Sequence, residues 1–170
     1  ELSKNSDCWA FLLLPIAMRL GENIKIEGEV TKAAIQAFDR AQKYLLEGHP
    51  HMREIKLEVS NLIDDSTAAV DSSRGVGLFF SGGLDSAFSA EMLHDVDKLI
   101  CVWGFDIPAT NSTHWQLTLD TLKPYANQLD KELMVVKTNI RELSNGLVEW
   151  GTDYHGSALA GVSIALTKHF

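Results

Sequence analysis

The stretch VGLFFSGGLDS, residues 76–86, joins a short apolar run to a segment of two glycines, an aspartate and two serines. Residues 76–80 are apolar on both faces, which is typical of a strand inside a parallel sheet. The glycines of SGGLDS (81–86) allow a tight turn, and the residues from Ser86 onward predict a helix. The stretch therefore predicts a strand that passes through a tight loop into a helix.

Two more apolar runs follow, at residues 99–105 and 133–136, and they predict two further buried strands. Helices are predicted between and after them, at 86–95, 112–129 and 156–168, with Pro124 expected to kink the middle one. Strands that alternate with helices indicate right-handed β-α-β units. The predicted fold class is α/β, with a doubly wound parallel sheet.

Residues 1–62 predict a small amino-terminal segment of strands and one helix. The run 9–16 is compatible with a strand, and the alternation around Ile24 and from residue 55 to 59 predicts two half-exposed strands. Thr31 is a candidate cap for a helix that ends near Gly48. Residues 63–74 are predicted to be a linker, and residues 75–170 the main domain.

The composition is that of an ordinary globular protein. The chain has 170 residues, of which 45% are apolar and 22% charged, and its net charge is −8. An acidic chain is repelled by a phosphate backbone, which disfavours nucleic acid as a partner. The apolar stretch 8–18 is too short to cross a bilayer, so no membrane partner is expected. Cys8 and Cys101 lie in apolar runs, which favours buried, reduced thiols and a cytoplasmic location.

The loop at 81–86 has the residue types of an anion site. The start of a helix presents unpaired N–H groups, and the hydroxyls of Ser81 and Ser86 add donors. Asp85 does not favour phosphate by itself, so its expected role is to hold a divalent metal ion that bridges phosphates. The alternative is a plain Gly-Gly turn with a polar helix cap. No lysine follows the glycines, so this is not the common P-loop of NTPases.

The segment SGGLDS resembles the signature of the PP-loop ATP pyrophosphatase superfamily, which includes asparagine, GMP and NAD synthetases. The resemblance covers residues 74–170 and is most specific in the six-residue motif. It implies that ATP is cleaved between its α- and β-phosphates while the loop holds pyrophosphate and Mg²⁺. A substrate oxygen would take the AMP, and a nitrogen nucleophile would then displace it. The expected cofactors are ATP and Mg²⁺, and the acceptor is an unidentified small molecule.

The resemblance, together with the expectation that ligands lie beyond the carboxyl ends of parallel strands, assigns further residues. Those expected to bind ATP are Ser81, Gly82, Gly83, Leu84, Asp85, Ser86, Trp103, Gly104, Phe105, Asp106, His155 and Gly156. Those expected to be catalytic are Asp85, which would also hold the metal, and the cations Lys137 and Arg141.

Each of these assignments has a structural alternative. Trp103 would equally fit a core position, and Asp106 a loop cap. Lys137 and Arg141 would also suit a solvated surface. His155 is expected at the start of the last helix, facing the same crevice as the loop, with a capping or core role as the alternative. His49 and His51 flank a proline in a polar turn and are interpreted as turn residues rather than metal ligands.

The sequence departs from the family pattern in three places. Glu1 stands where glutamine-using synthetases carry a catalytic cysteine, so no glutaminase is visible. Cys101 lies within a predicted strand, which disfavours a tRNA-thiolating enzyme. The chain ends directly after a helix, so a fourth strand is expected to be missing, and an exposed sheet edge would favour a homodimer. A nucleotide-binding sensor without catalysis is the main alternative function.

Overall fold

The computed structural model describes residues 2–64 and 75–170, which form two compact units. Within this part of the chain, residues 2–64 and 144–168 make up the first unit. Residues 75–143 and 169–170 make up the second. Most of the predicted linker, residues 65–74, lies outside the described residues.

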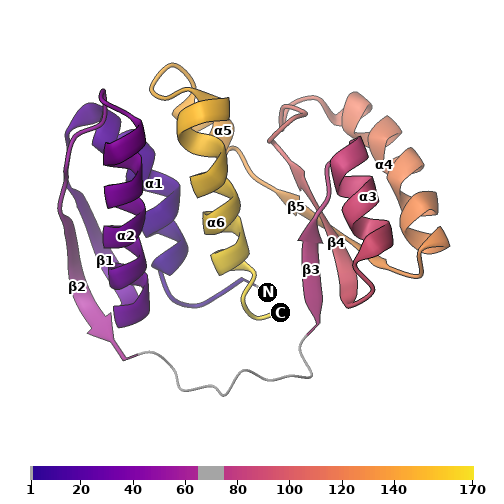
Figure 1. Ribbon diagram of the computed structural model, residues 1–170, viewed down its shortest axis with the longest axis horizontal. Helices are drawn as coiled ribbons and strands as arrows, with labels where there is room; N and C mark the ends of the chain where they lie inside the picture. The colour runs from indigo at the N-terminus through magenta and orange to yellow at the C-terminus, as the bar shows by residue number, and fades with distance from the viewer. Residues whose placement is uncertain (1, 65–74) are drawn as a thin grey trace. The chain divides into compact units, whose positions relative to one another are not determined.

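The first unit is built around a β-α-β crossover (Figure 1). Its helices and strands are α1 (Asp7–Leu20), β1 (Ile24–Thr31), α2 (Lys32–Gly48), β2 (Leu57–Ile63), the π-helical turn η1 (Trp150–Tyr154) and α6 (His155–Ala165). The two strands are parallel, and Ile24 pairs with Leu57 at one end and Thr31 with Ile63 at the other. Side chains of β1, α1 and α2 form one buried apolar core. The two half-exposed strands predicted around Ile24 and after residue 55, and the predicted helix after Thr31, are confirmed.

The prediction of a strand-like run at residues 9–16 is wrong, because this segment lies inside α1. Its leucines and alanines are good helix formers. Ala10, Leu14 and Met18 are fully buried, and α1 is apolar on nearly all sides. Such a helix lacks the alternation of polar and apolar faces by which a sequence reveals helical period.

The last helix, α6, packs against α1. The Tyr154 hydroxyl donates a hydrogen bond to the Leu12 carbonyl, at 2.7 Å. A methyl group at Gly161 would overlap the Leu12 side chain, so this glycine permits the close approach of the two helices. The structure thus groups α6 with the first unit, whereas the sequence interpretation grouped residues 156–168 with the domain that follows residue 75.

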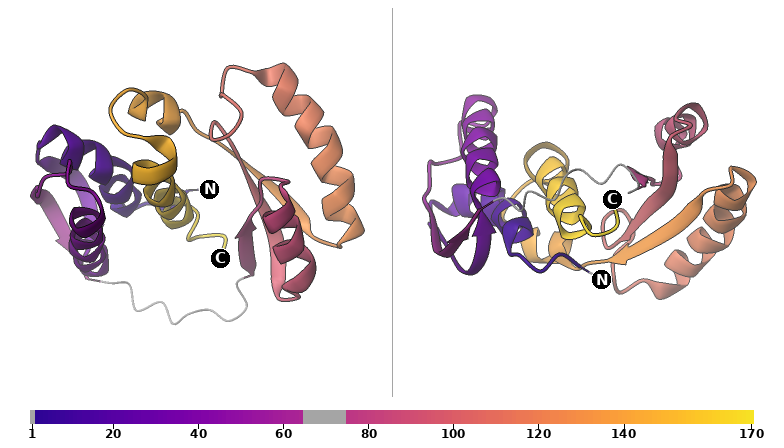
Figure 2. Two further views of the ribbon diagram at one scale, coloured as in Figure 1. Left: turned by 45° about the horizontal axis from the view of Figure 1, so that its top comes forward. Right: turned by 90° about the horizontal axis from the view of Figure 1, so that it is seen from below.

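The second unit has a three-stranded parallel sheet in the order β3-β4-β5 (Figures 1 and 2). Its elements are β3 (Val76–Phe79), α3 (Leu84–Met92), β4 (Val96–Trp103), α4 (Ser112–Gln128), β5 (Glu132–Lys137) and α5 (Ile140–Ser144), at whose last residue the chain enters the first unit. The three predicted strands and the two helices between them are confirmed, and α4 continues through Pro124.

Right-handed crossovers between successive neighbouring strands place α3 and α4 on the same face of this sheet. Leu99 and Cys101 of β4 form a buried cluster there with Ala90 of α3 and Leu122 of α4. On the opposite face, a methyl group at Gly77 would lie 2.6 Å from the ring of Phe170.

The α/β class is confirmed, since both units join parallel strands through helices. In the residues that the structure describes, no helix is long and apolar enough to cross a membrane.

Candidate functional site

The loop 81–86 connects β3 to α3, as the sequence predicts (Figure 1). Residues 81–85 are exposed, and Ser86 is half-buried. The Ser81 and Ser86 hydroxyl oxygens lie 3.3 Å apart. Ser81 Oγ also accepts a hydrogen bond from the Gly83 amide at 3.3 Å, and Ser86 Oγ donates to the Gly83 carbonyl at 2.9 Å. The hydroxyls of the two serines therefore stabilise the loop through hydrogen bonds within it.

The two glycines of the loop play different parts. Gly82 has a φ of 80°, and a methyl group there would lie 2.8 Å from Cδ2 of Leu122. Gly83 has an extended backbone, with φ −77° and ψ 168°, and a methyl group there would meet only Ser81 Oγ, at 3.4 Å. Only Gly82 is thus required by the backbone.

Gly83 is the N-cap residue of α3, and no side chain caps this helix. By contrast, the Asn111 side chain accepts a hydrogen bond from the His114 amide at the start of α4. Serine, threonine, asparagine and aspartate are the residues that usually fill the N-cap position. Glycine leaves the first N–H groups of α3 accessible to an external acceptor.

The end of β4 brings together the residues predicted to border a nucleotide base. Trp103 is half-buried and stacks on Trp115, with ring centroids 5.5 Å apart and planes at 4°. Its indole N–H donates to the Pro108 carbonyl at 3.0 Å. Phe105 is buried, whereas Asp106 is exposed. Trp103 thus has the core contacts of its structural alternative, and its contact with a base stays a prediction.

Gly104 holds the ends of β4 and β5 together. Its φ is 116°, and a methyl group there would overlap the Thr138 carbonyl oxygen. The Thr138 amide in turn donates to the Trp103 carbonyl at 2.9 Å. Glycine is needed here for the close approach of two backbones.

The two predicted cations lie just beyond this junction. The Lys137 ammonium sits 3.9 Å from the centroid of the Trp103 ring, and the Arg141 guanidinium donates to the Phe105 carbonyl. Lys137 is therefore held against the last residue of β4, and Arg141 against the segment that follows it. Because the strands are parallel, their carboxyl ends share one edge of the sheet. This edge carries the loop 81–86, the segment after β4 and residues 137–141.

Cys101 lies beneath this edge and is 2% exposed. Its thiol donates to the Phe80 carbonyl at 3.0 Å. Burial raises the pKa of Cys101 to about 12, so the sulfur stays protonated at neutral pH. The expectation of a buried thiol at this position is confirmed, as it is for Cys8.

His155 and Gly156 belong to the first unit, whereas the loop belongs to the second. As the sequence predicts, the last helix, α6, begins at His155, but the π-helical turn η1 precedes it directly and the His155 amide donates to the Trp150 carbonyl. The His155 ring packs against the Trp150 ring, with centroids 5.4 Å apart. A contact of His155 or Gly156 with nucleotide stays a prediction.

Sequence reasoning gave no role to Asp153, which the fold places beside His49 and His51. This carboxylate lies more than a hundred positions from both histidines, and only the His-Pro-His pattern marks the cluster in the sequence.

Comparison of the chain with protein-family models, curated proteins and solved structures finds no match in any of the three.

Proposed function

We propose that the second unit is the core of a PP-loop domain that binds Mg·ATP and transfers AMP to a small substrate. In this reaction a substrate oxygen attacks the α-phosphorus, the bond to the β-phosphate breaks, and pyrophosphate leaves. A nitrogen nucleophile then forms a bond to the activated carbon and displaces AMP. The finer fold in this proposal is a doubly wound parallel sheet.

The observation that carries the proposal is the uncapped start of α3 at Gly83, directly after a parallel strand. The open N–H groups and the positive end of the helix dipole favour an anion. The hydroxyls of Ser81, which is exposed, and of Ser86, which is half-buried, lie in the same loop and add donors for phosphate oxygens. Nothing about the backbone of Gly83 requires glycine, and this absence of a structural reason supports a role in ligand approach.

Asp85 fits the role of a magnesium ligand, because its carboxylate is exposed in the first turn of α3. Mg²⁺ prefers carboxylate and phosphate oxygens and, when bound, neutralises charge on the departing pyrophosphate. Lys137 and Arg141 are the candidate cations for the remaining negative charge. Their contacts with Trp103 and the Phe105 carbonyl would orient them at the carboxyl ends of the strands.

Calorimetric titration with Mg·ATP tests this proposal. Asp85→Asn is expected to weaken binding at least about tenfold, by analogy with the loss of an ion-positioning group. Asp95→Asn is the matched control, because Asp95 is also exposed but precedes β4 at the opposite ends of the strands. Excess pyrophosphate should displace the nucleotide from the unchanged protein.

Equal tightness in Asp85→Asn and Asp95→Asn would contradict the metal role of Asp85. Binding that pyrophosphate does not displace would contradict the placement of phosphates in the loop. Equal yields of AMP and pyrophosphate support the enzyme, whereas nucleotide binding with ATP recovered unchanged would favour a sensor. Steep loss of tRNA binding with added salt would instead favour a tRNA-modifying enzyme.

A further inference from the structure

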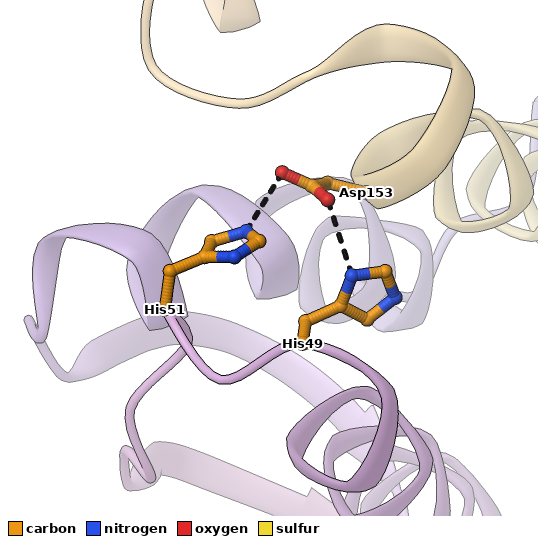
Figure 3. Close-up of side chains that lie close together, drawn as sticks. All are labelled: His49, His51 and Asp153. Carbon is orange, nitrogen blue, oxygen red and sulfur yellow. Dashed lines mark hydrogen bonds and ion pairs between the residues drawn. The ribbon is translucent and has the colours of Figure 1, made fainter.

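The turn after α2 and the η1 turn bring two imidazoles and one carboxylate together within the first unit (Figure 3). His49 Nδ1 lies 3.2 Å from Asp153 Oδ1, and His51 Nε2 lies 3.0 Å from Asp153 Oδ2. The three ligand atoms all lie within 4.8 Å of one another. In the part of the chain that the structure describes, this is the one group of three such residues that could hold a metal ion.

Asp153 is held firmly in this position. Its side chain is 4% exposed, and it accepts further hydrogen bonds from the Glu149 amide at 3.2 Å and the Thr152 hydroxyl at 3.1 Å. Burial by itself raises the pKa of Asp153, but hydrogen bonds from His51, Glu149 and Thr152 outweigh it and hold the pKa below its ordinary value. These contacts fix the carboxylate in one place, with one oxygen beside His49 and the other beside His51.

The backbone on both sides is anchored in the core. Tyr154, next to Asp153, is fully buried and bonded to the Leu12 carbonyl. The Met52 amide donates to the His49 carbonyl at 2.9 Å, and the Met52 side chain is buried. Asp153 itself lies in a π-helical turn, an irregularity that is frequent at functional sites. Ligands on anchored segments lose little freedom when an ion binds.

A hydrogen-bonded His–Asp–His cluster without metal is the competing interpretation. The two His–Asp spacings of 3.2 and 3.0 Å also suit a shared ion, because two ligand atoms about 2.0–2.1 Å from a tetrahedral metal lie roughly 3.3 Å apart. The His49 and His51 side chains are 19% and 39% exposed, so an ion has access from solvent and water can complete its coordination. Two imidazoles and one carboxylate are the ligands of zinc and similar transition metals rather than of magnesium.

We propose that His49, His51 and Asp153 bind a divalent transition-metal ion of the zinc type, with water in the remaining position. The ion joins the turn after α2 to the η1 turn, which are separated by about a hundred residues. An ion that binds the native state and not the unfolded state stabilises the fold by mass action, so it raises the unfolding temperature. This site does not depend on the function proposed for the second unit.

The test uses the full chain, without any affinity tag, after treatment with a chelator. Titration with zinc chloride should give saturation at about one ion per chain, and Co²⁺ should give visible d–d absorption bands. His51→Gln should weaken zinc binding at least about tenfold, because one of three protein ligands is lost. Its partly exposed side chain makes this variant safer for folding than Asp153→Asn.

His94→Gln is the matched control, since His94 is an exposed imidazole in the second unit. This variant should bind zinc as the unchanged protein does. Absence of stoichiometric binding in the unchanged protein would overturn the proposal, and so would equal zinc affinity in His51→Gln and His94→Gln. Displacement of zinc by millimolar Mg²⁺ would overturn the assignment to a transition metal.

Discussion

Both units contain a strand that runs directly into a crossover helix. The start of that helix is capped by a side chain in the first unit but not in the second. At the end of β1, the Thr31 hydroxyl accepts a hydrogen bond from the Ala34 amide and caps α2. The buried carboxylate of Asp7 accepts hydrogen bonds from the Thr31 amide at 2.8 Å and from its hydroxyl at 2.9 Å. At the end of β3, Gly83 caps nothing, and residues 81–85 are exposed.

The presence or absence of a helix cap distinguishes the structural junction between β1 and α2 from the candidate binding junction between β3 and α3. In the first unit, the chain supplies both the cap and an anion of its own. In the second unit, the same local geometry is left open to an external acceptor. An open helix start costs stability relative to a capped one, which is the kind of local conflict expected at a functional site.

The largest expected effect comes from removing the anion at the closed junction. Asp7→Ala leaves the Thr31 amide and hydroxyl, and the Asn5 side-chain amide, without their acceptor. We expect a loss of about 3 kcal/mol in the free energy of unfolding, since buried donors without partners are costly. Urea unfolding measures it, and hydrogen exchange should locate the loss in residues 24–48.

Asp39→Ala is the control for this substitution, because Asp39 is exposed on α2. Its effect should stay within about 0.5 kcal/mol. Similar effects of the two substitutions would mean that Asp7 does not support the junction.

A second prediction concerns the strand beneath the open junction and depends on pH. The pKa of Cys101 is raised to about 12 by burial, above the value near 9 of an exposed thiol. Its stabilising contribution is therefore full below pH 9 and is lost as the pH rises toward 12. The loss should be ~1 kcal/mol per pH unit.

Urea unfolding at a series of alkaline pH values measures this slope. Cys101→Ser cannot ionise in this range and should show a shallower decline than the unchanged protein. Identical slopes in the two proteins would show that Cys101 does not cause the decline.

The smallest effect on stability should come from closing the open junction. Gly83→Asp would give α3 a side-chain cap and an anion, as Asp7 and Thr31 do for α2. We expect a gain of about 0.5 kcal/mol in the free energy of unfolding. Mg·ATP binding should nevertheless fall at least about tenfold, because the added carboxylate repels phosphate.

Gly83→Ala separates charge from bulk, since a methyl group at this position meets only Ser81 Oγ at 3.4 Å. Calorimetry should therefore find tighter Mg·ATP binding in Gly83→Ala than in Gly83→Asp. A Gly83→Asp protein that binds as well as the unchanged one would place the ligand elsewhere.

Elements with a clear period or a clear boundary could be predicted from the sequence. The apolar face from Ala34 to Leu45 has helical spacing, and the run 76–80 is followed at once by glycines. Residues 9–16 were misassigned because α1 is buried on nearly all sides and shows no polar face. The packing of α6 on α1 was missed because the contact between Gly161 and Leu12 has no local signature.

The candidate sites divide in the same way. The loop 81–86 is contiguous, so its glycines, serines and aspartate already mark an anion-binding turn in the sequence. The positions of Lys137 and Arg141 near Trp103 and Phe105 follow from strand pairing. The partnership of Asp153 with two distant histidines could not be read from any pattern.

The sequence alone determined the parallel α/β class, the strand–loop–helix unit at 76–92 and the acidic, globular character of the chain, because these depend on neighbouring residues and on composition. Three features were decided by the tertiary structure. Asp7 binds the start of α2, α6 packs on α1, and Asp153 lies beside His49 and His51. Those contacts join residues far apart in the chain, and only the packing of whole helices and strands brings them within bonding distance.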